Sequence, residues 1–185
     1  MGASWGGLRA VNTILEGLPP WFLPPVVIVQ HRRAGPHTDL VRSFASRSAV
    51  PVLEPVDKSA ILSGHVYVAP ADYHLLVGRD GFALTIDEPR SFSRPSIDEL
   101  FHSAAEAFGA EAAGVLLTGA SDDGAAGLAR IRHRGGVGVV QDPETAERRQ
   151  MPDAALAAGG ALRVLPLDQI APFLIAVCGP SVVAQ

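Results

Sequence analysis

Apolar residues repeat along this chain with two different spacings. In the first twenty positions they recur at helical spacing, at Leu8, Val11, Ile14, Leu15 and Leu18. This spacing predicts a helix that ends before the Pro19-Pro20 pair. The next apolar segment, from Val26 to Val29, is an unbroken β-branched run. A strand without polar alternation is usually buried on both faces, as in a parallel sheet that helices cover.

The same alternation of strands and helices continues through the second half of the chain. Strands are predicted in AAGVLLTG, VGVVQ and LRVLP. Helices are predicted in the segment through Leu128 and Ile131, in PDAALAAGG and in LDQIAPFLIAV. A further helix is expected to begin at Ser96, because Ser96 and Glu99 have the spacing of a capping box.

The middle of the chain breaks this alternation. HVYVAP, HLLV and FALTID have the length of short strands, and Arg79-Asp80-Gly81 predicts a hairpin turn between the last two. We therefore predict an α/β fold of three layers, doubly wound about a mostly parallel sheet, with an antiparallel hairpin region near residues 64–87. No internal repeat or change of composition divides the chain, so residues 1–185 are predicted to form a single domain.

Composition narrows the classes of function. The formal net charge of −4 argues against a nucleic-acid partner, which needs a basic face. No apolar stretch reaches the ~20 residues that cross a bilayer, and the glycine-rich start lacks the pattern of a signal peptide. The single cysteine, Cys178, rules out a disulfide framework and fits a reducing cytoplasm. No H-x-x-x-H or H-E-x-x-H motif occurs, so we expect no metal site.

Polar residues suited to catalysis follow three of the predicted strands. Ser4 follows a very short first strand, His31 follows VVIVQ, and the Asp122-Asp123 pair follows GVLLTG. In open α/β sheets, ligands bind outside the carboxyl ends of the strands. A serine becomes nucleophilic when an imidazole accepts its proton, and a carboxylate holds that imidazole in the correct tautomer. The coincidence of the three positions favours a catalytic site.

Each position also has an ordinary structural interpretation. GASWGG fits a phosphate-binding turn or a nucleophile elbow, and Ser4 is equally suited to be a helix N-cap. His31 is one of six histidines, most of which are expected at the surface. Asp122 and Asp123 are suited to stabilise a helix that begins at Gly124. An elbow also needs a preceding strand, and since only three residues precede Ser4, that strand is a stub or extends beyond this sequence.

Several motifs in a fixed order resemble one protein family. The chain contains GASWGG, VVIVQH, GHVYVAP, RPSIDELF and LLTGASDDGAAG, followed by VVQD and MPDAA. This series resembles the catalytic domain of bacterial chemotaxis receptor methylesterases of the CheB type, from Gly2 to about Phe173. The resemblance implies a cytoplasmic enzyme that needs no cofactor. It would hydrolyse glutamate methyl esters on chemoreceptors and, as in many members, deamidate receptor glutamines.

The resemblance also implies roles for three residues. Matched by motif, Ser4 is the nucleophile, His31 is the base and Asp123 is the orienting acid. Asp122 then occupies a variable position. The order serine, histidine, aspartate along the chain differs from the order in α/β-hydrolases, so this elbow would have arisen independently.

The residues around this predicted triad define the expected substrate site. Backbone N–H groups of Trp5-Gly6 or of Gly119-Ala120 are the expected oxyanion donors, and Met151 belongs to the last motif of the site. Several neighbouring positions depart from the family pattern, namely Trp5 for threonine, Arg32-Arg33 after the base, Ala120 and Ser121 in the glycine turn, and Gln150 before Met151. These changes leave the predicted triad intact and alter the residues at the edge of the expected substrate site. They therefore affect which substrate is bound more than which reaction is catalysed.

The expected partners follow from the same resemblance. They are the cytoplasmic part of methyl-accepting chemoreceptors and a phosphorylated receiver domain, which commonly gates the esterase in this family. We find no receiver domain in this chain, and expect neither nucleic-acid binding nor membrane insertion. Two alternatives remain open, partly because of Trp5. One is an inactive relative that binds a receptor helix or a small anion at the same site, and the other is an esterase for a different acyl substrate.

Overall fold

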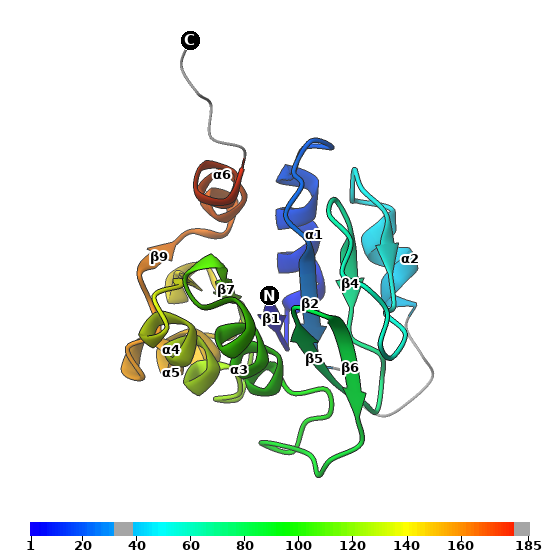
Figure 1. Cartoon of the computed structure of the whole chain (residues 1–185). Helices are drawn as coiled ribbons and strands as arrows, with labels where there is room; N and C mark the ends of the chain where they lie inside the picture. The colour runs from blue at the N-terminus through cyan, green and yellow to red at the C-terminus, as the bar shows by residue number, and fades with distance from the viewer. Residues whose placement is uncertain (32–38, 180–185) are drawn as a thin grey trace.

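Seven parallel strands form the central sheet in the computed structural model, which describes residues 1–31 and 39–179. Their order across the sheet is β3-β4-β2-β1-β7-β8-β9 (Figure 1). The strands are β1 (Gly2–Ala3), β2 (Val26–Gln30), β3 (Val52–Leu53), β4 (Val66–Val68), β7 (Ala113–Leu116), β8 (Val137–Gln141) and β9 (Arg163–Leu165). The chain thus begins at the centre of the sheet and adds strands first on one side and then on the other. Ligands bind where the strand order reverses in this way.

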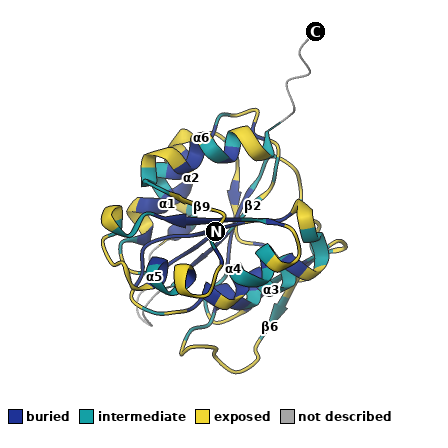
Figure 2. Cartoon of the chain, turned by 90° about the vertical axis from the view of Figure 1, so that its left-hand side faces the viewer, coloured by how far each residue is buried: buried dark blue, intermediate teal, exposed yellow. Residues whose placement is uncertain are grey.

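Helices cover both faces of the sheet (Figure 2). One face carries α1 (Gly7–Gly17), α2 (Leu40–Ala45) and α6 (Leu167–Cys178). The other face carries α3 (Ile97–Phe108), α4 (Ala125–His133) and α5 (Gln150–Ala157). Two 3₁₀ turns, η1 (Gly109–Glu111) and η2 (Pro143–Thr145), lie in the connections. The predicted three-layer, doubly wound fold is confirmed.

The antiparallel region is smaller than predicted. β5 (His74–Gly78) and β6 (Gly81–Thr85) form a separate two-stranded hairpin. The prediction began this region at residue 64, but β4 pairs in parallel with both β2 and β3 and belongs to the central sheet. The three residues of β4 are all buried. So short an apolar strand carries no signal for the direction of its neighbours, and this part of the prediction is wrong.

The sheet separates two apolar cores. The first core lies between the sheet and α1, α2 and α6, and includes Ile14 and Ile28. The second core lies between the sheet and α3, α4, α5 and the hairpin, and includes Val29 and Ile97. Successive side chains of a strand point to opposite faces, which is why the neighbours Ile28 and Val29 belong to different cores.

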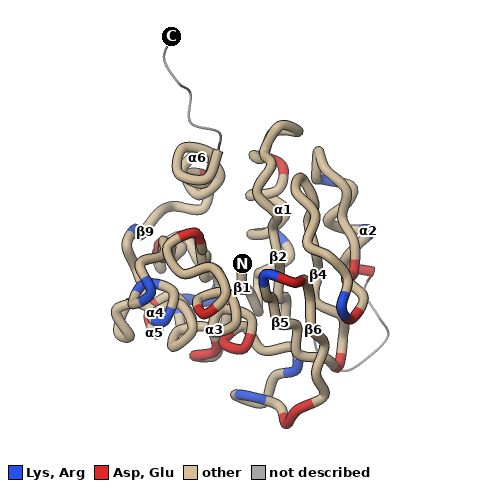
Figure 3. The backbone as a smooth tube through the Cα atoms, viewed as in Figure 1, with Lys and Arg blue, Asp and Glu red and all other residues tan. Residues whose placement is uncertain are grey.

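The charged residues lie mainly around the outside of this framework. Figure 3 shows acidic and basic residues interspersed on the outer helices and loops. Within the described ranges, no helix combines the length and the apolar character needed to cross a membrane.

Candidate active site

Ser4 lies in the sharp turn that joins β1 to α1. Its N–H donates to the Thr118 carbonyl (3.0 Å), and its own carbonyl accepts from the N–H of Gly7, the first residue of α1 (2.9 Å). Gly6 has a left-handed φ of 77°, and a side chain there would come within 2.8 Å of Glu147. No side chain caps α1, so Ser4 does not act as its N-cap. A serine held on such a strand-to-helix turn has the form of a nucleophile elbow.

Parallel pairing brings His31 to the same edge of the sheet as Ser4. Ala3 of β1 pairs with Gln30 of β2, so the next residue on each strand leaves the sheet at the same level. The His31 N–H donates to the Ala3 carbonyl (2.9 Å). Neighbouring strands lie ~4.8 Å apart, and the register therefore places Ser4 and His31 side by side.

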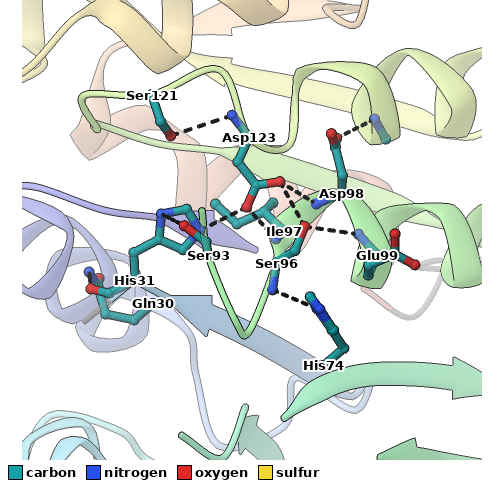
Figure 4. Close-up of polar contacts among 11 residues, drawn as sticks. Gln30, His31, His74, Ser93, Ser96, Ile97, Asp98, Glu99, Ser121 and Asp123 are labelled. Atoms are coloured by element: carbon teal, nitrogen blue, oxygen red, sulfur yellow. Dashed lines mark hydrogen bonds and ion pairs between the residues drawn. The ribbon is translucent and has the colours of Figure 1, made fainter. Parts of the chain in front are cut away.

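The loop after β7 supplies Asp123, whose side chain is fully buried. Its Oδ2 accepts from His31 Nε2 (2.7 Å) and from the Ile97 N–H (2.7 Å). Its Oδ1 accepts from the Ser96 hydroxyl (2.8 Å) and from the Asp98 N–H (3.0 Å). Figure 4 shows these contacts converging on one carboxylate. Three of the four donors belong to the start of α3, where the helix dipole favours a negative charge.

Opposing effects act on the pKa of Asp123. Burial, the largest effect, raises this pKa. Hydrogen bonds from His31 and from the Asp98 and Ile97 amides lower it, and together they outweigh burial, so the pKa lies below its ordinary value. Asp123 is therefore a carboxylate at neutral pH.

The partners of His31 assign its tautomer. Because Asp123 is a carboxylate, His31 Nε2 carries the proton and donates it in the 2.7 Å hydrogen bond. The lone pair then lies on Nδ1, and the Ser93 hydroxyl is 3.5 Å from that nitrogen. With only 10 % of its side chain exposed, His31 offers one basic nitrogen on the side opposite the carboxylate. Such a nitrogen can accept a proton from a hydroxyl group.

Comparison with known proteins assigns the family. The sequence model of the CheB methylesterase family matches residues 1–174. The chain belongs to the CheB methylesterase family. The crystal structure of the Thermotoga maritima CheB methylesterase catalytic domain is similar to this fold, with a TM-score of 0.90 and 33% identity over 95% of each chain.

Two curated relatives support the same assignment. A Leptospira interrogans protein, provisionally named protein-glutamate methylesterase/protein-glutamine glutaminase, is 46% identical over 176 residues, which span 95% of this chain and 91% of that protein. A Geobacter metallireducens protein, named protein-glutamate methylesterase/protein-glutamine glutaminase 4, is 43% identical over 172 residues. That match covers 92% of this chain and 50% of the Geobacter protein.

Gln30 is a site residue of this CheB-family chain that sequence reasoning did not identify. Its Nε2 donates to the carbonyls of both Ser4 (2.8 Å) and His31 (3.0 Å). Its Oε1 is buried without a hydrogen-bond partner among the described residues, and a side chain at Gly7 would overlap this oxygen. Gln30 therefore ties the backbone of one candidate catalytic residue to that of the other. The sequence feature that could have identified Gln30 is a polar residue at the end of an otherwise apolar strand.

The backbone of Gly119 is already engaged in hydrogen bonds. Its N–H donates to the Arg148 carbonyl, and its carbonyl accepts from the Met151 N–H, both at 3.0 Å. A side chain at Gly119 would overlap the Met151 sulfur and lie 2.9 Å from the Ser4 Cβ. Two expected roles therefore change. Gly119 is not an available oxyanion donor, and Met151, expected to line the substrate site, is fully buried against Gly119.

Asp122, the first aspartate of the pair, has a different environment from Asp123. It is exposed, and its carbonyl accepts from the Ala125 N–H at the start of α4 (3.1 Å). The N-cap position of α4 is Gly124, and no side chain caps this helix. Asp123 therefore does not cap the helix that follows it in sequence, and its carboxylate binds the start of α3 instead.

Trp5, which replaces a threonine of the family pattern, is about half exposed at 49%. Its indole N–H donates to Glu147 (2.8 Å), and the Arg148 guanidinium lies over the ring at 5.1 Å from the centroid. Its carbonyl accepts from the Thr118 hydroxyl (2.9 Å). These contacts hold Trp5 as a fixed side chain next to Ser4. Arg32 and Arg33, which follow His31 and also differ from the family pattern, lie outside the described residues, as does His37.

The described residues offer no obvious metal site. Across residues 1–31 and 39–179, no three histidine, cysteine or carboxylate side chains are grouped as metal ligands would be. That the enzyme works without a metal or a cofactor stays a prediction.

Proposed function

We propose that this CheB-family chain is a serine hydrolase that cleaves methyl esters of glutamate side chains on chemoreceptors. In this proposal Ser4 is the nucleophile, His31 is the general base, and Asp123 orients and stabilises the imidazole. One observation carries most of the weight. It is the 2.7 Å hydrogen bond between His31 and a buried carboxylate, made at the strand position that is in register with Ser4. The names of the curated relatives provide the substrate class.

The reaction proceeds in two halves. The Ser4 oxygen bonds to the ester carbonyl carbon while His31 Nδ1 takes the hydroxyl proton. The bond from carbon to the methoxy oxygen then breaks, and methanol leaves with the proton from His31. A water molecule attacks the acyl-enzyme as His31 takes one of its protons. The bond to Ser4 breaks as Ser4 takes that proton back from His31, and the released glutamic acid side chain ionises to a carboxylate by giving its proton to water.

Two backbone N–H groups are suitable oxyanion donors. Of the four positions expected to hold the oxyanion, Gly119 already donates to Arg148. Within residues 1–31 and 39–179, the N–H groups of Gly6 and Ala120 have no acceptor. Gly6 lies two residues after Ser4, Ala120 directly follows Gly119, and a side chain added at Gly119 would come within 2.9 Å of the Ser4 Cβ. Each preorganised donor of this kind lowers the barrier by about 3 kcal/mol.

The same site accounts for the second activity named for the relatives. A glutamine side chain presents the same carbonyl, with ammonia in place of methanol as the leaving group. We propose a cytoplasmic chemoreceptor as the protein partner, and a phosphorylated receiver domain, joined to the domain or separate from it, as its regulator. We also propose that residues 1–185 act as one catalytic domain.

Methanol release from a methylated receptor fragment tests the proposal. Ser4→Ala is expected to lower turnover by about 10⁶-fold, because the three residues act as a unit. Ser46→Ala is a matched control, since Ser46 lies at the exposed end of α2 and its hydrogen bonds among the described residues stay within that turn. If Ser4→Ala released methanol as fast as an active wild-type protein, the assignment of Ser4 as the nucleophile would be contradicted. A folded wild-type protein that releases no methanol would favour the inactive binding module.

A further inference from the structure

The segment between β6 and α3 leaves the body of the molecule as an exposed loop. Figures 1 and 2 show it extending beyond the hairpin and the helices around it. It runs from residue 86 to residue 95, and we call it the 86–95 loop. Two of its apolar side chains, Ile86 and Phe92, are exposed.

Side chains hold the two ends of the 86–95 loop together. The buried His74 ring accepts from the Ser96 N–H through Nδ1 (3.2 Å) and donates through Nε2 to the Glu88 carbonyl (3.2 Å). Arg94 Nη1 donates to the carbonyls of Ile86 (2.9 Å) and Asp87 (3.1 Å). These contacts cross the base of the loop and give it a defined shape.

The tip of the 86–95 loop is a tight turn. Arg90 and Ser93 exchange backbone hydrogen bonds of 3.1 and 2.8 Å, and the Arg90 guanidinium pairs with Glu99 of α3. The two central residues, Ser91 and Phe92, have φ values of 48° and 61°. Positive φ at both positions defines a type I′ turn, which normally contains Asn-Gly.

Phe92 is therefore unusual in both backbone and environment. A bulky residue rarely adopts a left-handed conformation, and the Phe92 side chain is fully exposed, at 104% of its reference area. No packing within the described chain accounts for a phenylalanine at this position. Residues held in such conformations cluster at ligand and partner sites.

The turn that presents Phe92 also reaches the candidate active site. The Ser93 hydroxyl lies 3.5 Å from His31 Nδ1, the nitrogen proposed to act as the base. Consecutive Cα atoms are about 3.8 Å apart, so Phe92 projects from the immediate edge of the reacting centre. A glutamyl carbonyl carbon lies only three bonds, about 4 Å, from its own Cα. A protein that delivers this carbonyl to Ser4 must therefore press its surface against the residues around His31.

We propose that Phe92 is a docking contact for the protein substrate. It would pack against an aliphatic side chain that the receptor presents beside the esterified glutamate. The inference rests on the proposed function, and it adds a determinant of specificity for protein substrates over free small esters. Exposed aromatic residues on a preformed loop are well suited to contact a protein substrate, because they bury a large apolar area on binding with little loss of conformational freedom.

A comparison of two substrates tests the docking contact. The kcat/KM of Phe92→Ser is measured on a methylated receptor fragment and on the γ-methyl ester of N-acetylglutamate. The ratio of the first kcat/KM to the second is expected to fall about 10-fold or more relative to wild type, as for an aromatic interface anchor. Phe92→Leu, which keeps an apolar side chain, should recover most of the ratio. Leu23→Ser is the matched control, because Leu23 is exposed just before β2, at the opposite edge of the sheet.

Three outcomes would overturn this inference. The first is a Phe92→Ser variant whose kcat/KM is unchanged on both substrates, and the second is an equal fall in kcat/KM on both substrates, which would indicate damage to the catalytic centre. The third is a dimer that Phe92→Ser dissociates in sedimentation experiments, which would make a second copy of the chain the occupant. A wild-type enzyme that cleaves neither substrate would instead refute the proposed function itself, and the docking role with it.

Discussion

At the scale of single residues, the environment of Asp123 differs from that of its neighbour Asp122. The two are identical in chemistry and adjacent in sequence, yet one is fully buried and the other is exposed. Four hydrogen bonds converge on Asp123, and those from His31, Asp98 and Ile97 hold its pKa below the ordinary value despite burial, which raises it. A carboxyl whose pKa is lower in the folded state stabilises the fold when it is ionised.

Asp123→Asn tests this stabilisation through its pH dependence. At pH 7 the variant is expected to lose about 2–3 kcal/mol of unfolding free energy, because an amide cannot accept four charge-assisted hydrogen bonds. The wild-type contribution is fully present above the unfolded pKa of about 4 and is lost as the pH falls through the lower folded pKa. Urea unfolding at pH 7, 5, 4 and 3 should therefore show the two proteins converging in stability at acid pH. A difference that stays constant down to pH 3 would contradict the assigned pKa direction.

At the scale of elements, the start of α3 has a second role besides beginning a helix. The capping box predicted at Ser96 is partly formed, since the Ser96 hydroxyl accepts from the Glu99 N–H (3.4 Å). The same hydroxyl donates to Asp123 (2.8 Å), and the next two amides of the helix bind the same carboxylate. The N-terminus of α3 therefore orients the acid of the proposed triad.

Ser96→Ala removes both contacts of this hydroxyl. The unfolding free energy is expected to fall by about 1–2 kcal/mol, the usual effect of losing an N-cap. Turnover should fall as well, because Asp123 loses one of its four donors. Asp39→Ala is the control, since Asp39 caps α2 through the Arg42 N–H (2.9 Å) away from the site. Equal turnover in the two variants, measured by methanol release, would show that the cap of α3 has no part in orienting Asp123.

At the scale of the whole molecule, the two cores differ in their relation to the site. Ile14 of α1 and Ile97 of α3 are both helical and fully buried, but they belong to the first and second cores respectively. The Ile97 N–H binds Asp123. Side chains added at Gly2 or Gly124 would overlap or crowd the Ile97 side chain, so Ile97 packs between β1 and the start of α4. The second core thus directly supports the geometry of the proposed triad.

Ile14→Ala and Ile97→Ala separate stability from site geometry. Both are expected to lower the unfolding free energy by about 2–5 kcal/mol, because each leaves a cavity. At a temperature where both variants are folded, only Ile97→Ala should lose turnover per folded molecule, by about 10–100-fold, since a small displacement of catalytic groups has this effect. Circular dichroism and methanol release on the same samples would provide the comparison. A similar loss of turnover in both variants would mean that the site is sensitive to the whole fold.

The order of strands and helices, the three-layer class and the candidate residues Ser4, His31 and Asp123 could all be predicted from the amino-acid sequence. Hydrophobic periodicity is a local property, and the strand ends that carry polar residues can be located from it. The direction of β4, the four hydrogen bonds that bury Asp123 beside the exposed Asp122, and the roles of Gln30 and of the 86–95 loop became known only from the folded molecule. These depend on which strands pair and on which polar groups become buried together. Contacts of that kind join residues far apart in the chain, and neither partner carries a local signal of the other.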